Sequence, residues 1–176
     1  MDKRAVKIIK FTLSHEGGYA NDPRDKGGET YRGISRRYYP EWVGWRTIDQ
    51  IKQHRKIKNN EIIEALELPV MSFYYYKFWM LHRVDEITDL ADLVFDMLVN
   101  HSIKNATKII QRSLNELGAK LTVDGVLGSK TIESLNTYLN NARNHIVNNR
   151  IEYYKSLDDF DIFGEVWLAR ARLYYG

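Results

Sequence analysis

Apolar residues recur along most of the chain at intervals of three and four, which is the spacing of one face of an α-helix. The first apolar stripe covers residues 6–13, and the glycine pair at 17–18 is expected to end this helix. A capping box is predicted to open another helix at residues 47–50. The same periodicity predicts further helices near residues 34–39, 61–66, 73–79, 90–101, 109–117, 129–139, 142–154 and 165–174.

Residues 17–33 interrupt the helical pattern with a long, glycine-rich loop. Turn-forming residues occupy positions 21–23 and 27–28, whereas Thr30 and Tyr31 favour an extended strand. The sequence therefore predicts a mainly α protein in which a long loop or a short β-hairpin follows the first helix.

The chain is long enough for one ordinary hydrophobic core, with 176 residues of which 44% are apolar. A soft boundary is expected near residue 103, between a region 1–103 and a region 104–176. No linker of flexible composition separates the two regions, so one compact unit is expected. The absence of cysteine excludes a disulfide scaffold and a thiolate metal site.

The formal net charge of +3 is mild. A nucleic-acid-binding module is usually more basic, with its cations gathered on one face, so no nucleic-acid partner is expected. No apolar run approaches membrane-spanning length, and Lys7 and Lys10 interrupt the N-terminal apolar residues. The chain is therefore expected to have no signal peptide and no stable membrane association.

Candidate chemistry concentrates in H-E-G-G-Y-A-N-D-P-R-D-K-G-G-E-T-Y-R-G-I, residues 15–34. Glu16 is expected at a helix C-terminus, where free carbonyls carry partial negative charge and raise the pKa of a carboxyl group. Cleavage of a glycosidic bond needs such a protonated acid, so Glu16 is the predicted general acid. The simpler alternative is a surface acid that happens to precede a glycine cap.

A second catalytic group is also required, as a nucleophile or to activate water. Asp25, nine positions after Glu16, is preferred over Asp22, whose place before a proline suggests a role in the turn. Thr30 is predicted to hold a water, or else to pack in a strand. Within the same loop the candidate substrate-binding residues are Tyr19, Asn21, Asp22 and Tyr31, of which the tyrosines offer ring faces to sugars.

No metal site is expected. The five histidines are scattered and none has the H-E-x-x-H spacing of a zinc site. The spacing of Asp22 and Asp25 differs from that of a calcium-binding EF-hand loop.

The loop 15–34 resembles the signature of glycoside hydrolase family 108, the N-acetylmuramidases of phages and bacteria. The segment L-V-F-D-M-L-V-N, residues 93–100, resembles a buried helix of that family and places Asn100 toward its cleft. Residues 110–115 and 123–131 resemble an accompanying peptidoglycan-binding part. Phage-type lysozymes are a looser parallel, in which the threonine comes one residue later than Thr30 does here.

The resemblance implies a lysozyme-like fold, Glu16 as the catalytic acid, and cleavage between N-acetylmuramic acid and N-acetylglucosamine without a cofactor. It further implies bacterial peptidoglycan as the partner and a monomeric phage or prophage endolysin. Such a protein is expected to stay in the cytoplasm until a holin releases it to act on the wall. The main alternative is a wall-binding or secretion-assisting protein that keeps the fold without turnover.

Overall fold

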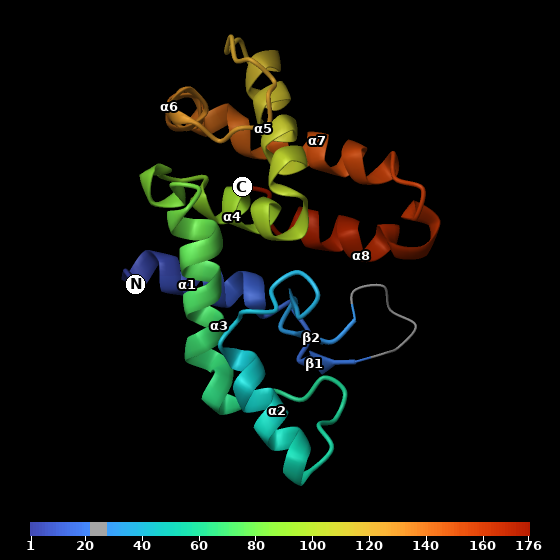
Figure 1. Cartoon of the computed structure of the whole chain (residues 1–176). Helices are drawn as coiled ribbons and strands as arrows, with labels where there is room; N and C mark the ends of the chain where they lie inside the picture. The colour runs from blue at the N-terminus through green and yellow to red at the C-terminus, as the bar shows by residue number, and fades with distance from the viewer. Residues whose placement is uncertain (22–27) are drawn as a thin grey trace. The chain divides into compact units, whose positions relative to one another are not determined.

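Figure 1 shows the computed structural model of the protein, which describes residues 1–21 and 28–176. The described part is mainly helical and has one small antiparallel sheet, so the expected mainly α fold with a short hairpin after the first helix is confirmed. The chain divides into two compact units, Met1–Lys77 and Phe78–Gly176. The boundary expected at residue 103 stays a prediction.

The first unit contains three α-helices and the sheet. The strands follow the order β1-β2-β3, and Tyr31 of β2 pairs with both Tyr19 and Ile34. α1 packs against α3. The elements are α1 (Lys3–Leu13), β1 (Tyr19–Ala20), β2 (Thr30–Tyr31), β3 (Ile34–Ser35), α2 (Gly44–His54), the 3₁₀-helix η1 (Glu64–Leu66), α3 (Glu67–Tyr74) and the π-helix η2 (Tyr75–Met80), within which the two units join.

α1 ends earlier than its glycine pair predicts. Its last residue is Leu13, and the Ser14 hydroxyl then donates to the carbonyl of Phe11. Neither Gly17 nor Gly18 has a positive φ, so the expected glycine stop is wrong. Their role is close approach, since a Cβ on Gly18 would lie 2.4 Å from the carbonyl oxygen of Asn60.

Two other local predictions in this unit are wrong. The segment predicted as a helix at 34–39 begins instead with β3, because a two-residue turn pairs it with β2. The residues 47–50 lie inside α2, which begins at Gly44, and therefore do not cap it. In both places tertiary hydrogen bonding and burial override a weak local signal.

The second unit is entirely helical in the described residues. α7 packs against α5, α6 and α8, while α4 packs against α5. The helices predicted here are confirmed, although α5, α7 and α8 begin several residues before their predicted starts. Their bounds are η3 (Val84–Glu86), α4 (Ala91–Asn100), α5 (Ile103–Glu116), α6 (Ser129–Thr137), α7 (Leu139–Lys155) and α8 (Phe160–Arg172).

The turn at Asp124-Gly125 is held by one side chain of α5. Gln111 donates to the Asp124 carboxylate at 2.8 Å and accepts from the backbone N–H of Gly125 at 2.9 Å. Gly125 has a φ of 80°, and a Cβ there would lie 2.7 Å from the side chain of Lys104. The turn thus joins α5 to the start of α6.

A charged cluster lies in the core of the second unit. Asp96 of α4 pairs with Arg150 of α7 at 2.7 Å and with Arg170 of α8 at 3.0 Å. The side chains of Asp96 and Arg150 are both 0% exposed. His101 stacks on Tyr154 and accepts a hydrogen bond from Arg150 Nε at 3.2 Å. One carboxylate therefore links three helices.

His101 makes the second unit sensitive to acid. Burial and the charges of Arg150 and Arg170, opposed by Asp96, lower the pKa of His101 from 6.5 to about 3. His101 therefore binds a proton at a higher pH in the unfolded chain than in the folded chain. The contribution of neutral His101 to stability is lost as pH falls from 6.5 to about 3. We expect the free energy of unfolding to fall with a slope approaching ~1.4 kcal/mol per pH unit from this group.

Urea unfolding at a series of pH values measures this slope. His101→Gln keeps an acceptor for Arg150 but cannot titrate. Its free energy of unfolding should therefore fall less steeply with decreasing pH than that of the wild type, and the difference should correspond to the uptake of one proton. Equal slopes for the two proteins would show that His101 is not the responsible group.

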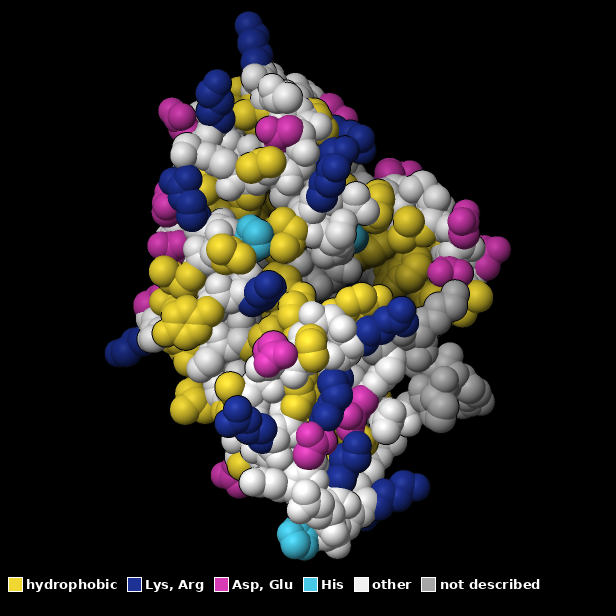
Figure 2. Space-filling model, in the orientation of Figure 1, with side chains coloured by type: hydrophobic (Ala, Val, Ile, Leu, Met, Phe, Trp, Pro, Cys, Tyr) yellow, Lys and Arg dark blue, Asp and Glu magenta, His cyan; other side chains and the backbone are white. Residues whose placement is uncertain are grey.

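On the face shown in Figure 2, basic and acidic side chains are interspersed. None of the described helices is both long enough and apolar enough to cross a membrane.

Candidate active site

Glu16 lies in the turn after α1, and its carboxylate reaches the turn between β2 and β3. Its backbone N–H donates to the carbonyl of Leu13 at 3.1 Å, and Arg32 Nη1 donates to the carbonyl of Glu16 at 3.0 Å. A Cβ built on Gly33 would lie 3.2 Å from Glu16 Oε2. The carboxylate of this partly exposed residue therefore rests against a glycine that has no side chain to displace it.

The turn beneath Glu16 has an unusual backbone. Arg32 has a φ of 49° and Gly33 a φ of 77°, the pair of positive values that a type I′ hairpin turn requires. Tyr74 of α3 fixes the turn from the other side, because its hydroxyl donates to the carbonyl of Arg32 at 2.7 Å. The chain after α1, the hairpin and α3 thus all meet at Glu16.

The Glu29 carboxylate binds two cationic side chains and a tyrosine hydroxyl beside β1. Its Oε1 accepts from the Tyr19 hydroxyl at 2.6 Å and from Lys52 Nζ at 2.9 Å, while Oε2 pairs with Arg36 at 2.8 Å. Arg36 also pairs with Asp49 at 2.7 Å. Burial, reinforced by Glu29, raises the pKa of Tyr19 to about 12. Both carboxylate oxygens of Glu29 therefore already have partners within the folded chain.

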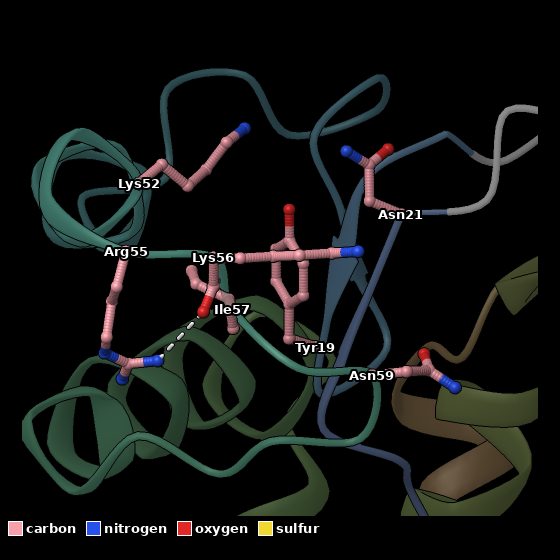
Figure 3. Close-up of a pocket in the computed structure, with 7 residues that line it drawn as sticks. All are labelled: Tyr19, Asn21, Lys52, Arg55, Lys56, Ile57 and Asn59. Atoms are coloured by element: carbon pink, nitrogen blue, oxygen red, sulfur yellow. Dashed lines mark hydrogen bonds between the residues drawn. The ribbon is translucent and has the colours of Figure 1, made fainter.

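A groove of about 550 Å³ opens next to this network. Figure 3 shows that its lining side chains come from β1, from the residue that follows β1, and from the end of α2 and the segment after it. In the view of Figure 3 the Lys52 ammonium and the Asn21 amide lie on either side of the Tyr19 hydroxyl, while the Lys56 side chain runs across the Tyr19 ring. The lining residues are Tyr19, Asn21, Lys52, Arg55, Lys56, Ile57 and Asn59.

The structure brings some of the predicted site residues together. Tyr19 and Asn21 both line the groove, and Tyr19 is three residues from Glu16. Thr30 lies in β2, opposite Ala20 on one side and Ser35 on the other. Its role with a catalytic water stays a prediction.

Tyr31 has a different place from the one predicted. It is 0% exposed, stacks on Trp42 with ring centroids 6.0 Å apart, and accepts from the N–H of Ile63 at 2.8 Å. No face of this ring is left for a sugar, so a direct substrate contact for Tyr31 conflicts with its burial. A tyrosine in a two-residue strand looks the same in sequence whether its ring points inward or outward.

Asp22 and Asp25 lie outside the described residues, so their predicted roles as turn former and second catalytic group stay predictions. Asn100 is the last residue of α4 and donates to the carbonyl of Asp96 at 2.8 Å. Its expected place in a substrate cleft also stays a prediction. The described residues contain no group of three or more side chains able to hold a metal ion.

The sequence analysis missed several residues of this site. Arg32 and Gly33 carried a usable signal, because a residue followed by glycine between two strand-like pairs is typical of a two-residue hairpin turn. Tyr74 falls within the helix predicted at 73–79, and nothing in its spacing indicates that its hydroxyl supports the turn. Lys52, Arg55 and Lys56 are close in sequence, but only the fold shows that they border a groove.

A family model described as Glycosyl hydrolase 108 matches residues 9–102, which is more than half of the chain. The chain belongs to glycosyl hydrolase family 108. The matched region of this family 108 chain includes Glu16, the hairpin and the groove. A second model, described as Predicted Peptidoglycan domain, matches residues 105–176. Together the two matches identify a glycoside hydrolase that acts on peptidoglycan.

Among solved structures, the family 108 chain is similar to the one titled "Structure of Brucella abortus SagA". The TM-score is 0.69 at 23% sequence identity, over 97% of this chain and 90% of the other. At this identity the likeness shows a shared fold. No curated protein matches the chain.

Proposed function

We propose that the chain is an N-acetylmuramidase that cleaves the bond between N-acetylmuramic acid and N-acetylglucosamine, with Glu16 as its general acid. The observation that carries the proposal is the setting of the Glu16 carboxylate against Gly33. Arg32 and Tyr74 hold that setting from two sides, through hydrogen bonds of 3.0 and 2.7 Å. A partly exposed carboxylate in a fixed position is what proton donation to a bound polymer requires.

In the proposed reaction Glu16 gives its proton to the oxygen that leaves when the glycosidic bond breaks. Positive charge then develops on the sugar ring, and a second group must stabilise it or activate a water. Glu29 is a poor candidate for this role, because Tyr19, Lys52 and Arg36 already engage both of its oxygens. Asp25 remains our proposal for the second group, with Asp22 as its competitor.

The remaining proposed contacts serve substrate binding. Tyr19 and Asn21 lie at the groove, and Thr30 is proposed to hold the attacking water. Asn100 is proposed as a further substrate contact from α4. The match of residues 105–176 to a peptidoglycan domain supports a second region that holds the same polymer.

Analysis of the new reducing ends tests the proposed bond. Purified peptidoglycan is digested with the protein, the products are reduced with borohydride, and the reduced sugar is identified by mass spectrometry. A muramidase produces reduced N-acetylmuramic acid. Reduced N-acetylglucosamine as the only new end would assign the opposite bond and overturn the proposal.

A second candidate function is wall binding without turnover, which the peptidoglycan-domain match also favours. This candidate predicts that the protein sediments with insoluble peptidoglycan but releases no reducing ends. A time course of bound protein and of soluble reducing sugar, measured on the same sample, separates the two functions.

Gly33→Ala is expected to lower activity by at least about tenfold, because small displacements of a catalytic group are costly. The added methyl would lie 2.7 Å from the Tyr74 hydroxyl and 3.2 Å from Glu16 Oε2, so the carboxylate must move. Gly28→Ala is the matched control. Gly28 also has a positive φ, 67°, but a Cβ there would have no neighbour within 4 Å among the described residues.

Both alanine variants should lose about 1 kcal/mol of stability from the left-handed backbone. Only Gly33→Ala should lose most of its activity, measured as kcat/KM on soluble glycan strands. Equal activities of the two variants would contradict the positioning of Glu16 by the hairpin turn.

A further inference from the structure

The groove beside β1 has no part in the proton transfer described above. We propose that it binds the peptide stem of peptidoglycan, through the carboxylates and the backbone amides of that stem. The inference rests on the proposed function, because the stem is attached to the muramic acid whose bond the enzyme would cut. It adds a peptide-recognition site to an enzyme that cleaves a sugar–sugar bond.

The charges of the groove favour an anion. Every charged residue among the described residues of its lining is a cation, and two of them are held in place by acids outside the lining. Lys52 pairs with Glu29 at 2.9 Å, and Arg55 pairs with Glu61 at 2.5 Å. Lys56 makes neither an ion pair nor a side-chain hydrogen bond with any residue in the described part of the chain. No described residue therefore occupies its ammonium group, which is the kind of group that binds a carboxylate.

The other lining groups favour a peptide over a purely anionic polymer. Asn21 and Asn59 each carry an amide that both donates and accepts, which matches the N–H and C=O groups of a peptide backbone. Ile57 and the ring of Tyr19 supply apolar surface between them. A teichoic acid offers phosphates and hydroxyls, but it lacks the regularly spaced N–H and C=O groups of a peptide backbone, which pair with both ends of a side-chain amide.

The groove is also close enough to the proposed acid. Only two residues separate Glu16 from Tyr19, so their backbones are at most about 11 Å apart. A stem of several residues, attached to the sugar at Glu16, spans that distance. The groove volume of about 550 Å³ also falls within the range of about 300–1,000 Å³ typical of ligand pockets.

Paired substrates test the inference. Glycan strands that keep their peptide stems are compared with strands from which an amidase has removed the stems, and kcat/KM is measured on each. The wild type should prefer the strands with stems. Lys56→Gln should reduce kcat/KM on these strands roughly two- to fivefold, mainly through KM, and Lys56→Glu by about tenfold.

Neither Lys56 substitution should alter cleavage of the stripped strands. Lys7→Gln is the matched control, since Lys7 is an exposed lysine of α1 and its loss changes the net charge equally. Added salt should reduce the preference for stems, because exposed charges are screened. An unchanged Lys56→Gln enzyme, or an equal loss on both substrates, would overturn the inference.

A binding measurement separates this inference from the proposed function. The isolated stem tetrapeptide is titrated into the wild type and into Lys56→Gln by calorimetry, with poly(glycerol phosphate) as the competing anion. Weaker binding to Lys56→Gln supports the groove even if no glycan is cleaved, in which case only the proposed function fails. Binding of poly(glycerol phosphate) without binding of the peptide would assign the groove to a phosphate polymer and sink the inference.

Discussion

Glu16→Gln is expected to lower kcat on peptidoglycan by about 10²–10⁴-fold, the usual contribution of a general acid. Glutamine preserves the size of the side chain and its contact with Gly33, but it has no acidic proton to give to the leaving oxygen. The backbone hydrogen bond from Arg32 to the carbonyl of residue 16 is also kept. Binding should therefore survive, and the loss should fall on kcat rather than on KM.

Reducing-end release from soluble glycan strands measures this effect, and circular dichroism checks that the variant is folded. Glu41→Gln is the matched control, because Glu41 is an exposed acid of the same unit. That control should retain wild-type kcat. A Glu16→Gln enzyme within threefold of wild type would remove Glu16 from the mechanism and leave the acid to be found elsewhere.

Asp96→Asn is expected to cost about 3–5 kcal/mol of stability, the typical effect of breaking a buried ion pair from one side. The amide is neutral, so Arg150 at 0% exposure and Arg170 at 15% exposure lose their shared counter-charge. A loss of this size should lower Tm by about 10 °C in a chain of this length.

Thermal and urea unfolding measure the loss. Asp92→Asn is the matched control on the same helix, since its ion pair with Arg143 has side chains 38% and 22% exposed. Pairs this exposed contribute no more than about 1 kcal/mol. Similar losses for the two variants would show that the Asp96 cluster contributes no more than a surface pair.

Helices with a regular apolar stripe could be predicted from their periodicity. α5 has one face of apolar residues at helical spacing, and such a stripe needs no knowledge of its partner to be recognised. Short elements were harder. The six residues at 34–39 satisfy a helical pattern, but Ile34 and Ser35 pair with a strand on the other side of a two-residue turn. A sequence window that covers only residues 34–39 does not include the strand with which the first two of them pair.

Asp96 shows the same contrast within one helix. In the sequence Asp96 is one acid in an otherwise apolar helical segment, a pattern that fits a place in the core as well as a place in a cleft. The choice depends on Arg150 and Arg170, which lie 54 and 74 positions later and reach Asp96 only when α7 and α8 pack. The second unit therefore uses this acid for stability.

By itself the sequence determined the mainly helical fold, the presence of a long loop or short hairpin after the first helix, and the family, because these depend on periodic spacing and on a long local signature. The tertiary structure decided what surrounds Glu16. Gly33 and Tyr74 are brought to it by a turn and by a distant helix, and Tyr31 is taken into the core. It also decided that Glu29 serves a network of cations beside an open groove. Such placements depend on which surfaces pack together, and distance along the chain says little about packing between distant segments.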